Sequence, residues 1–237
     1  MTGTNLQNFY ENKEAAYRNL SSHIGERERV VLSLFPSRPA PLRVLDVGCG
    51  TGRFLRCLKE IGHQPIGFEI SEAAVDAARA SGLEVLRGNV ENSAELASAG
   101  SGFDVITALD VLEHTFDPAA VLNRLAGLLK PDGCIIASVP NIGSVAGRAT
   151  ILRGRFPSKP VGLFDSGHIR WFTRSNLASY IPPSLALAFC TGTPLPAISR
   201  CGLWRIENFQ NIFLRPLARL LPGLFSYQLV FKAVPVK

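Results

Sequence analysis

Short apolar runs and amphipathic segments alternate through the middle of the chain. Apolar runs bounded by turn residues are typical of buried strands, whereas apolar residues three or four positions apart are typical of helices. This alternation predicts βαβ units and a parallel sheet, with Ser71 as a helix N-cap and a turn over 130–133. The predicted strands are 44–47, 64–69, 84–87, 103–109 and 134–139, and the predicted helices are 53–61, 71–81 and 118–129.

The two ends of the chain carry different patterns. Apolar and aromatic residues at helical spacing over 5–34 predict two helices, with a break at Gly25. Residues 204–209 and 227–234 are the last two predicted strands, joined by a basic amphipathic link over 215–221. The proline-containing stretch 181–199 has no assigned conformation.

A glycine-rich turn follows the first predicted strand. Residues 44–52 read VLDVGCGTG, so the glycines have the spacing G-x-G-x-G and a helix follows them. A dinucleotide-binding turn has its third glycine three residues after the second, where a pyrophosphate meets the helix N-terminus. Asp46, two positions before the first glycine, would hold a cationic group and would gain nothing from a diphosphate. The turn therefore indicates a positively charged nucleoside, the alternative being an unliganded strand-to-helix turn.

The motif VLDVGCGTG resembles the first motif of the class I S-adenosylmethionine-dependent methyltransferases, and the resemblance extends over about 43–177. It is similar in particular to small-molecule O-methyltransferases of the quinone-biosynthesis type. The resemblance implies an α/β fold: a doubly wound, Rossmann-like, seven-stranded, mostly parallel sheet with a C-terminal antiparallel hairpin. It implies S-adenosylmethionine as the cofactor, and an N-terminal helical segment that closes over it, with Tyr10 or Tyr17 as a contact or a core residue.

Polar residues at the ends of the predicted strands are candidate cofactor ligands. Glu69 ends the second strand, where a carboxylate accepts hydrogen bonds from both ribose hydroxyls. The resemblance places Asn89, where the family more often has Asp, and Val90 at the adenine edge, and Leu109 and Asp110 at the methionine part. The full predicted cofactor-binding set is Asp46, Gly48, Cys49, Gly50, Gly52, Glu69, Ile70, Asn89, Val90, Leu109 and Asp110.

The segment D-x-x-E-H after the fourth predicted strand is the candidate catalytic cluster. Glu113, His114 and, from a later segment, His168 are the predicted catalytic residues, because an imidazole can take a hydroxyl proton near neutral pH. The segment also resembles the E-x-x-E-H metal site of relatives that methylate RNA 2'-hydroxyls or quinone-precursor phenols. If it is helical, Asp110 lies one turn from Glu113 and His114, and His168 could be a fourth ligand. A divalent metal is possible but not expected, and a purely structural role is the third alternative.

Charge divides the chain into two unequal parts. The net charge is +6, yet residues 1–144 carry 13 Lys and Arg against 17 Asp and Glu, whereas residues 145–237 carry 12 against 2. The segment 145–164 mixes Arg148, Arg153, Arg155 and Lys159 with large apolar side chains. This mixture predicts a substrate lid that also meets an anionic surface, either an acidic or lipid-like substrate or a membrane; an ordinary packed helix is the alternative.

One domain accounts for the whole chain, 1–237. We expect an N-terminal helical segment (1–40), a cofactor-binding core (41–140), a substrate lid or insertion (141–200) and C-terminal strands (201–237). The five cysteines form no C-x-x-C pair, which predicts reduced thiols, and no run approaches the ~20 apolar residues of a membrane span. A cytoplasmic protein, peripheral at the membrane if at all, is therefore expected.

The predicted function is methyl transfer from S-adenosylmethionine to a hydroxyl group of a small molecule. No C-P-P-C-like or N-P-P-Y-like motif is present, which argues against enzymes that methylate amino groups of nucleic acids. An RNA methyltransferase is the alternative on charge grounds and would lose affinity steeply with salt. A cofactor-binding protein without activity is a further alternative. The sequence predicts neither the acceptor nor the oligomeric state.

Overall fold

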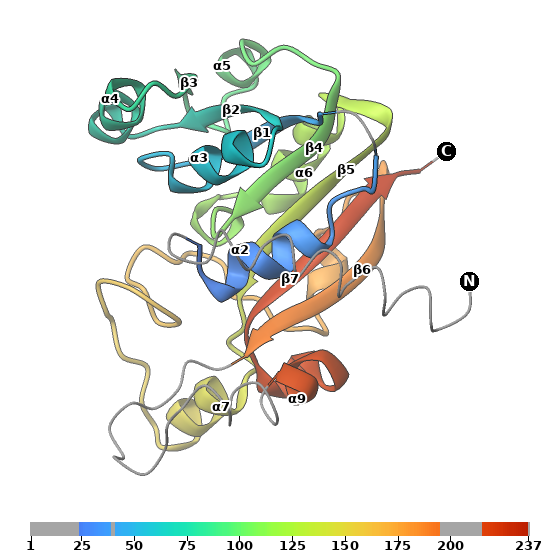
Figure 1. The fold of residues 1–237 in the computed structure, drawn as a ribbon. Coiled ribbons are helices and arrows are strands. Elements are labelled where there is room, and N and C mark those ends of the chain that lie inside the picture. Colours follow the sequence, from blue (N-terminus) through green and yellow to red (C-terminus); the bar gives the residue numbers. More distant parts are fainter. Residues whose placement is uncertain (1–23, 39–40, 195–214, 237) are drawn as a thin grey trace.

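The apolar runs of the chain form one sheet at the centre of the molecule. The structure is a computed structural model and describes residues 24–38, 41–194 and 215–236. Seven strands have the order β3-β2-β1-β4-β5-β7-β6. The first five are parallel, and β7 is antiparallel to both β5 and β6 (Figure 1). The predicted seven-stranded, mostly parallel sheet with antiparallel C-terminal strands is confirmed.

The order of the elements along the chain is that of consecutive βαβ units. The strands are β1 (Arg43–Val47), β2 (Gln64–Glu69), β3 (Val85–Arg87), β4 (Phe103–Leu109), β5 (Leu129–Pro140), β6 (Leu185–Pro194) and β7 (Ser226–Pro235). The α-helices are α2 (Glu26–Ser33), α3 (Arg53–Glu60), α4 (Glu72–Ala80), α5 (Ser93–Ala97), α6 (Pro118–Ala126), α7 (Val145–Leu152), α9 (Arg215–Leu220) and α10 (Pro222–Phe225). The described residues also form two 3-10 helices, η1 (Leu112–His114) and η2 (Leu177–Tyr180).

Both faces of the sheet are buried, because successive strand residues point to opposite sides. Val44 of β1 packs with residues of α2 and α3, in one apolar cluster. The next residue, Leu45, packs with residues of α6 on the other side, in a second cluster. Helices therefore cover both faces, as in a doubly wound sheet, and Figure 1 shows α2 and α3 on the side opposite to α6.

Several local predictions are confirmed within a residue or two. Ser71 is the N-cap of α4, where its hydroxyl accepts a hydrogen bond from the backbone N–H of Ala74.

The predicted turn at 130–133 is wrong, because these residues belong to β5 and form an irregularity in its pairing with β4. Gly133 allows β5 to lie close to β4 at this irregularity, since a Cβ there would lie 2.8 Å from the carbonyl oxygen of Phe103.

The C-terminal half differs from the prediction in its penultimate strand. The described partner of β7 at the edge of the sheet is β6, which comes from the stretch with no assigned conformation. The predicted strand 204–209 lies outside the described residues, as do Tyr10 and Tyr17. The basic link before the last strand is confirmed as α9. Within the described part of the chain, no helix combines the length and the hydropathy that crossing a bilayer requires.

Candidate active site

A cavity of about 350 Å³ lies at the carboxyl ends of β1, β2, β3 and β4. The strand order reverses direction between β1 and β4, and such a switch point leaves a crevice where ligands of open α/β sheets bind. Six residues of the predicted cofactor-binding set line this cavity: Gly48, Glu69, Ile70, Asn89, Val90 and Asp110. His114 lines it too, so the topology brings the candidate cofactor ligands and one candidate catalytic residue together.

The glycine turn approaches this cavity with a backbone that other residues adopt rarely. Gly50 has a φ of 54°, and a Cβ built on it would meet no atom within 4 Å, so its open face is available to a ligand. Gly52 has a φ of 80° and needs its small size for packing, because a Cβ there would lie 2.3 Å from a methyl carbon of Leu83. Gly50 therefore leaves space beside the backbone, whereas Gly52 allows the turn to pack against the residues before β3.

Glu69 joins the two loops that border the cavity. Its Oε2 accepts a hydrogen bond from the backbone N–H of Gly50 at 2.9 Å, and its Oε1 accepts one from that of Ser71 at 2.8 Å. An ionised carboxylate has about four acceptor positions, so each oxygen keeps capacity for a further donor. This geometry suits a carboxylate that receives two ribose hydroxyls while its own orientation is held by the backbone.

Asn89 uses part of its amide for the local fold. Its Oδ1 accepts a hydrogen bond from the backbone N–H of Glu91 at 2.9 Å, and its own backbone N–H donates to Glu95 Oε2 at 2.7 Å. The amide NH₂ has no hydrogen-bond partner in the part of the chain that the structure describes and remains a donor beside the cavity. Ile70, 62% exposed, adds an apolar surface suited to a purine ring.

Other members of the predicted cofactor set lie behind the cavity wall. Asp46 is buried in β1, and its Oδ1 accepts a 2.6 Å hydrogen bond from the hydroxyl of Thr107. Burial raises the pKa of Asp46 to about 7, although the bond from Thr107 opposes the rise. Burial also raises the pKa of the Cys49 thiol to about 12. Leu109 packs against the cluster on the α2 side of the sheet, and none of these three residues lines the cavity.

The raised pKa of Asp46 predicts a specific pH dependence of stability. The folded protein keeps this proton up to about pH 7, whereas the same carboxyl in the unfolded chain has its ordinary pKa of 3.8. The proton's contribution to the free energy of unfolding is therefore complete below pH 3.8 and is lost as pH rises to about 7. Asp46→Asn does not titrate, so its stability relative to wild type should rise across this window and then level off. Urea unfolding at a series of pH values measures the difference; parallel curves for the two proteins would contradict the assignment.

Asp110 is the one described non-glycine residue with positive φ, at 57°. It follows the end of β4 in a left-handed conformation, and η1 begins only at Leu112, so the predicted helical spacing from Asp110 to Glu113 and His114 is wrong. Its carboxylate accepts hydrogen bonds from the Ser138 hydroxyl, from Gln228 and from the guanidinium of Arg27. The other three candidate metal ligands, Glu113, His114 and His168, come together without Asp110.

Arg27 of α2 is a residue that the motifs did not point to. Its guanidinium pairs with Asp110, which lines the cavity, and with Glu28 at 3.0 Å. Burial lowers the pKa of Arg27, but Asp110 and Glu28 outweigh that effect and raise it. The Arg27 cation suits the carboxylate of an amino acid, and the neighbouring Asp110 carboxylate suits its ammonium group. The helical pattern predicted α2, but the charge run ERER does not indicate which arginine turns inward.

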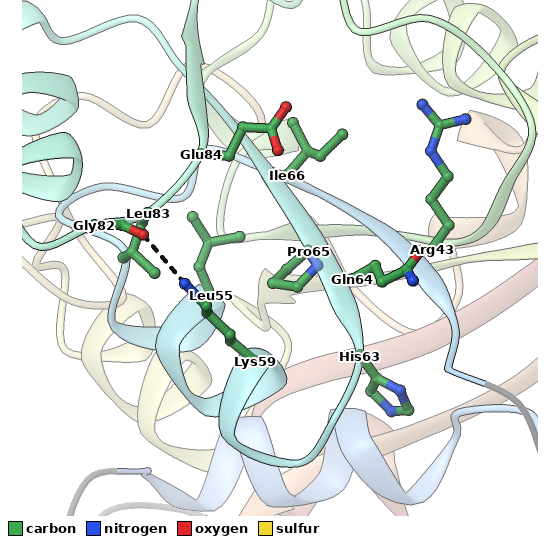
Figure 2. A pocket seen from close by; sticks show the side chains of 10 residues that line it. All are labelled: Arg43, Leu55, Lys59, His63, Gln64, Pro65, Ile66, Gly82, Leu83 and Glu84. Atoms are coloured by element: carbon green, nitrogen blue, oxygen red, sulfur yellow. Dashed lines mark hydrogen bonds between the residues drawn. The ribbon is translucent and has the colours of Figure 1, made fainter.

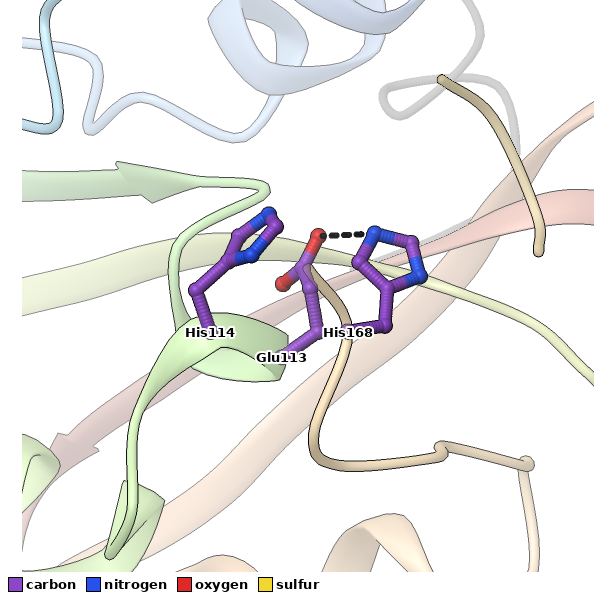
Figure 3. A group of neighbouring side chains, drawn as sticks. All are labelled: Glu113, His114 and His168. Atoms are coloured by element: carbon purple, nitrogen blue, oxygen red, sulfur yellow. Dashed lines mark ion pairs between the residues drawn. The ribbon is translucent and has the colours of Figure 1, made fainter. Parts of the chain in front are cut away.

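Glu113, His114 and His168 come together from η1 and the later segment (Figure 3). His168 Nε2 lies 4.0 Å from Glu113 Oε1, and the two imidazole ring centres are 4.9 Å apart. The later segment is held in place because the carbonyl oxygen of Glu113 accepts hydrogen bonds from the backbone N–H groups of Ile169 and Arg170. The sequence separates His168 from the other two residues by more than fifty positions, and the fold makes them neighbours.

Burial favours the uncharged forms of Glu113 and His168. Glu113 is completely buried, and neither carboxyl oxygen has a hydrogen-bond partner among the described residues. Burial, and then the charge of Asp110, hold the pKa of Glu113 well above its usual range. Burial, and then His114, lower the pKa of His168. Both groups are thus favoured in their uncharged forms.

His114 differs from these two groups because it is exposed and lines the cavity. Its Nδ1 lies 2.9 Å from the carbonyl oxygen of Gly167. A carbonyl can only accept a hydrogen bond, so Nδ1 carries the proton, and Nε2 of the neutral ring is left as an acceptor. This arrangement is that of a base whose tautomer is set by the backbone.

The same three side chains could hold a divalent cation. They offer one ligand atom each, and these atoms lie within 4.8 Å of one another. The unpartnered carboxyl of Glu113 and two imidazoles form a donor set that suits transition metals. Such a site would have three protein ligands, because Asp110, the fourth ligand considered from the sequence, is not among them.

A family model described as a methyltransferase domain matches residues 17–181. The match covers the glycine turn, the cavity and the cluster of Glu113, His114 and His168. The chain belongs to this methyltransferase family.

Curated relatives share part of this chain. The ubiquinone biosynthesis O-methyltransferase of Stutzerimonas stutzeri (strain A1501) is 38% identical over 103 residues, covering 42% of this chain and 44% of the relative. The protein of that name from Shewanella halifaxensis (strain HAW-EB4) is 35% identical over 129 residues, covering 52% and 55%. The chain spans about half the length of the curated relatives it matches.

Solved structures share the fold over nearly the whole chain. A Thermotoga maritima S-adenosylmethionine-dependent methyltransferase, described as a possible histamine N-methyltransferase, has a TM-score of 0.60 at 19% identity and covers 97% of this chain and 99% of its own. The magnesium protoporphyrin IX methyltransferase of Synechocystis, with bound SAH, has a TM-score of 0.58 at 18% identity, covering 89% and 84%. At these identities the likeness supports the fold alone.

Proposed function

We propose that this protein transfers the methyl group of S-adenosylmethionine to a hydroxyl group of a small molecule. The observation that carries the proposal is the orientation of His114. A residue on the wall of the cavity presents an unprotonated imidazole nitrogen, and a hydroxyl acceptor must lose its proton as it is methylated. The names of the curated relatives support an oxygen atom as the acceptor.

The residues around the cavity fit this cofactor. Glu69 would receive the ribose hydroxyls, the Asn89 amide and Ile70 would meet the adenine, and Arg27 with Asp110 would meet the charged ends of the methionine part. The open face of Gly50 leaves room for the ligand to approach the backbone. When bound, S-adenosylmethionine supplies a methyl group already activated by its positive sulfur.

The protein then has two tasks, which are to position the acceptor and to remove the proton of its hydroxyl group. His114 Nε2 takes the hydroxyl proton, while the Gly167 carbonyl holds the ring by accepting a hydrogen bond from Nδ1. Glu113, which is buried, and His168, which is half-buried, hold the segment that carries Gly167 next to η1 and act as positioning residues.

The surroundings of His168 favour an acceptor with an apolar or aromatic body. Trp171 packs edge-on against His168 at 5.7 Å and against Phe156 at 5.0 Å between ring centres. Phe156 is 60% exposed, so a row of rings runs from the surface toward the two histidines. A turnover screen against phenols, sugars and lipid precursors, with and without Mg²⁺, tests the proposal. Methyl transfer only to amines or to RNA would contradict it.

We further propose that the segment 145–164 meets an anionic surface such as membrane headgroups. Leu152 is 87% exposed and Val161 is 73% exposed, which is unusual for large apolar side chains. Arg148, Arg153, Arg155 and Lys159 are exposed in the same segment. Leu163 and Phe164, by contrast, are buried, and the Leu163 N–H donates to the Tyr227 hydroxyl at 3.0 Å. The exposed part of the segment is therefore anchored to β7 at one end and presents apolar and cationic side chains to its surroundings.

Flotation with liposomes tests this surface. The wild-type protein is expected to float with anionic vesicles and to remain behind with neutral ones. The double variant Arg153→Gln/Arg155→Gln should lose about 2 kcal/mol of binding, or roughly thirtyfold, at ~1 kcal/mol for each cation. The control Arg56→Gln/Arg87→Gln removes two exposed cations outside the segment and should bind as wild type does. Equal flotation of both double variants would contradict the proposed surface.

A further inference from the structure

Three leucines are exposed together on α9 and α10, at one corner of the molecule. Leu220 is 76% exposed, Leu221 51% and Leu224 37%, although leucine is usually buried. Because the three lie within one short stretch of chain, they form an apolar patch and are not scattered surface residues. Such patches mark surfaces that contact another molecule or a membrane.

Polar contacts hold α9 against the rest of the protein and leave the leucines outside. The guanidinium of Arg215 pairs with Glu26 of α2 at 2.6 Å. The Ser226 hydroxyl donates to the carbonyl oxygen of Ala218 at 3.1 Å, and Ala218 is completely buried. The helix is therefore fixed by its inner side, so the exposure of the leucines belongs to the packed structure.

The same corner fastens both ends of the segment 145–164. The side-chain amide of Asn141, shortly before α7, donates to two carbonyl oxygens of α10, each at 3.2 Å. Near the other end of the segment, the Leu163 N–H donates to the hydroxyl of Tyr227, which follows α10. Two stretches that are far apart in the sequence therefore meet at this corner, and Figure 1 shows α7 and α9 at the same end of the molecule.

The charged side chains of the two stretches are all of one sign. Residues 145–164 and 215–225 contain six Lys and Arg and no Asp or Glu. Arg215 is paired, but the exposed Arg219 has no carboxylate within ion-pair distance in the part of the chain that the structure describes. Separate cations among exposed aliphatic side chains suit an anionic bilayer, because a lipid surface meets each cation separately and adapts its shape to both stretches.

This corner lies at the edge of the sheet where the parallel strands end. β7 begins at Ser226, directly after α10, and is antiparallel to β5, so its first residues lie beside the end of β5. The side-chain amide of Gln228, near the start of β7, donates to Asp110, which lines the cavity of the candidate active site. The corner and the cavity therefore share one edge.

The opposite edge of the sheet carries cations together with carboxylates. A cavity of about 530 Å³ opens there, and the residues that line it include Lys59 and Glu84 (Figure 2). Arg38, at the same edge, pairs with two carboxylates, at 2.9 and 2.6 Å. Since like charges repel an anionic surface, charge favours the active-site edge for contact with a bilayer.

We propose that α9 and α10 form, with the exposed part of the segment 145–164, one surface that docks on an anionic bilayer and turns the active-site edge of the sheet toward the lipid. This adds a second element to the surface proposed for the segment and fixes the orientation of the protein. The purpose of the orientation, to bring the cavity close to acceptors held in the membrane, rests on the proposed function. The docking does not depend on methyl transfer.

Vesicle binding tests the contribution of the leucines. The wild-type protein should bind vesicles of phosphatidylglycerol and phosphatidylcholine and not those of phosphatidylcholine alone. Leu220→Ser/Leu221→Ser should bind the anionic vesicles at least tenfold more weakly, because two leucine side chains no longer enter the lipid. The control Phe189→Ser/Val236→Ser removes two exposed apolar side chains outside the corner and should bind as wild type does. Thermal unfolding confirms that both variants fold, and equal binding of the two would overturn the proposal.

Fluorescence quenching tests the orientation with variants that keep an apolar side chain. Leu220→Trp places an indole in the patch, whereas Val236→Trp places one just after the end of β7, at the opposite edge. Anionic vesicles with brominated acyl chains quench an indole that enters the hydrocarbon. More quenching than in wild type is expected for Leu220→Trp and none for Val236→Trp. Additional quenching of both variants, or of neither, would overturn the orientation.

Sedimentation distinguishes a bilayer from a second copy of the chain. Wild type and Leu220→Ser/Leu221→Ser should have the same oligomeric state. A wild-type dimer that the double variant dissociates, without vesicle binding, would assign the patch to self-association and overturn the proposal. Methyl transfer to a hydroxyl without vesicle binding would also overturn it and leave the proposed function standing. Vesicle binding without methyl transfer to any hydroxyl would contradict the proposed function and leave the docking surface standing.

Discussion

Glu69→Ala is expected to weaken the binding of S-adenosylmethionine at least tenfold. The substitution removes the acceptor for two ribose hydroxyls, and hydrogen bonds to a charged group contribute ~1.5 to 3 kcal/mol each. It also removes the connection between the N–H groups of Gly50 and Ser71, so the two loops lose a shared anchor. Isothermal titration calorimetry measures the change directly.

A neighbouring carboxylate serves as the control for Glu69. Glu72 is exposed and pairs with Arg87 at 2.9 Å on the surface, outside the lining of the cavity. Glu72→Ala should bind S-adenosylmethionine with wild-type affinity, since exposed ion pairs contribute little. Equal affinities for the two alanine variants would remove Glu69 from the site. Gly50→Val, which blocks the open face of the turn and forces a β-branched residue into positive φ, should bind more weakly still.

His114→Ala is expected to lower kcat about 10² to 10⁴-fold, the usual contribution of a positioned general base. The affinity for S-adenosylmethionine should stay within about twofold of wild type, because the candidate cofactor ligands lie on other elements. Steady-state kinetics with the best acceptor of the turnover screen, and calorimetry with the cofactor, separate the two effects. Full activity of His114→Ala would leave positioning alone as the mechanism.

The conservative variant His114→Gln separates the base from its hydrogen bond. Glutamine can donate to the Gly167 carbonyl, as Nδ1 does, but it cannot take a proton. Its kcat should therefore resemble that of the alanine variant. A chelator should leave wild-type activity intact. Inactivation by the chelator and recovery with a divalent transition metal such as Zn²⁺ would instead assign Glu113, His114 and His168 to a metal site.

The regular elements around the sheet were readable from local pattern alone. Strands 64–69 and 103–109 were predicted with the bounds they have in the structure, because an apolar run between two turns has few other ways to bury its side chains. The penultimate strand was missed because β6 lies at the edge of the sheet, where Phe189 remains 45% exposed and the apolar pattern is weak. The turn signal at 130–133 was overridden by pairing with β4, which absorbs the extra residues as an irregularity.

What the sequence determined by itself was the glycine turn, the strand ends that surround it and the chemistry these residues suit, since all of them depend on neighbours along the chain. The tertiary structure decided which side chains face one another. Only the fold brings Arg27 to Asp110, His168 to Glu113 and the Gly167 carbonyl to His114. Only burial holds the pKa of Asp46 at about 7, because the desolvation of a carboxyl depends on everything packed around it and not on the residues beside it in the chain.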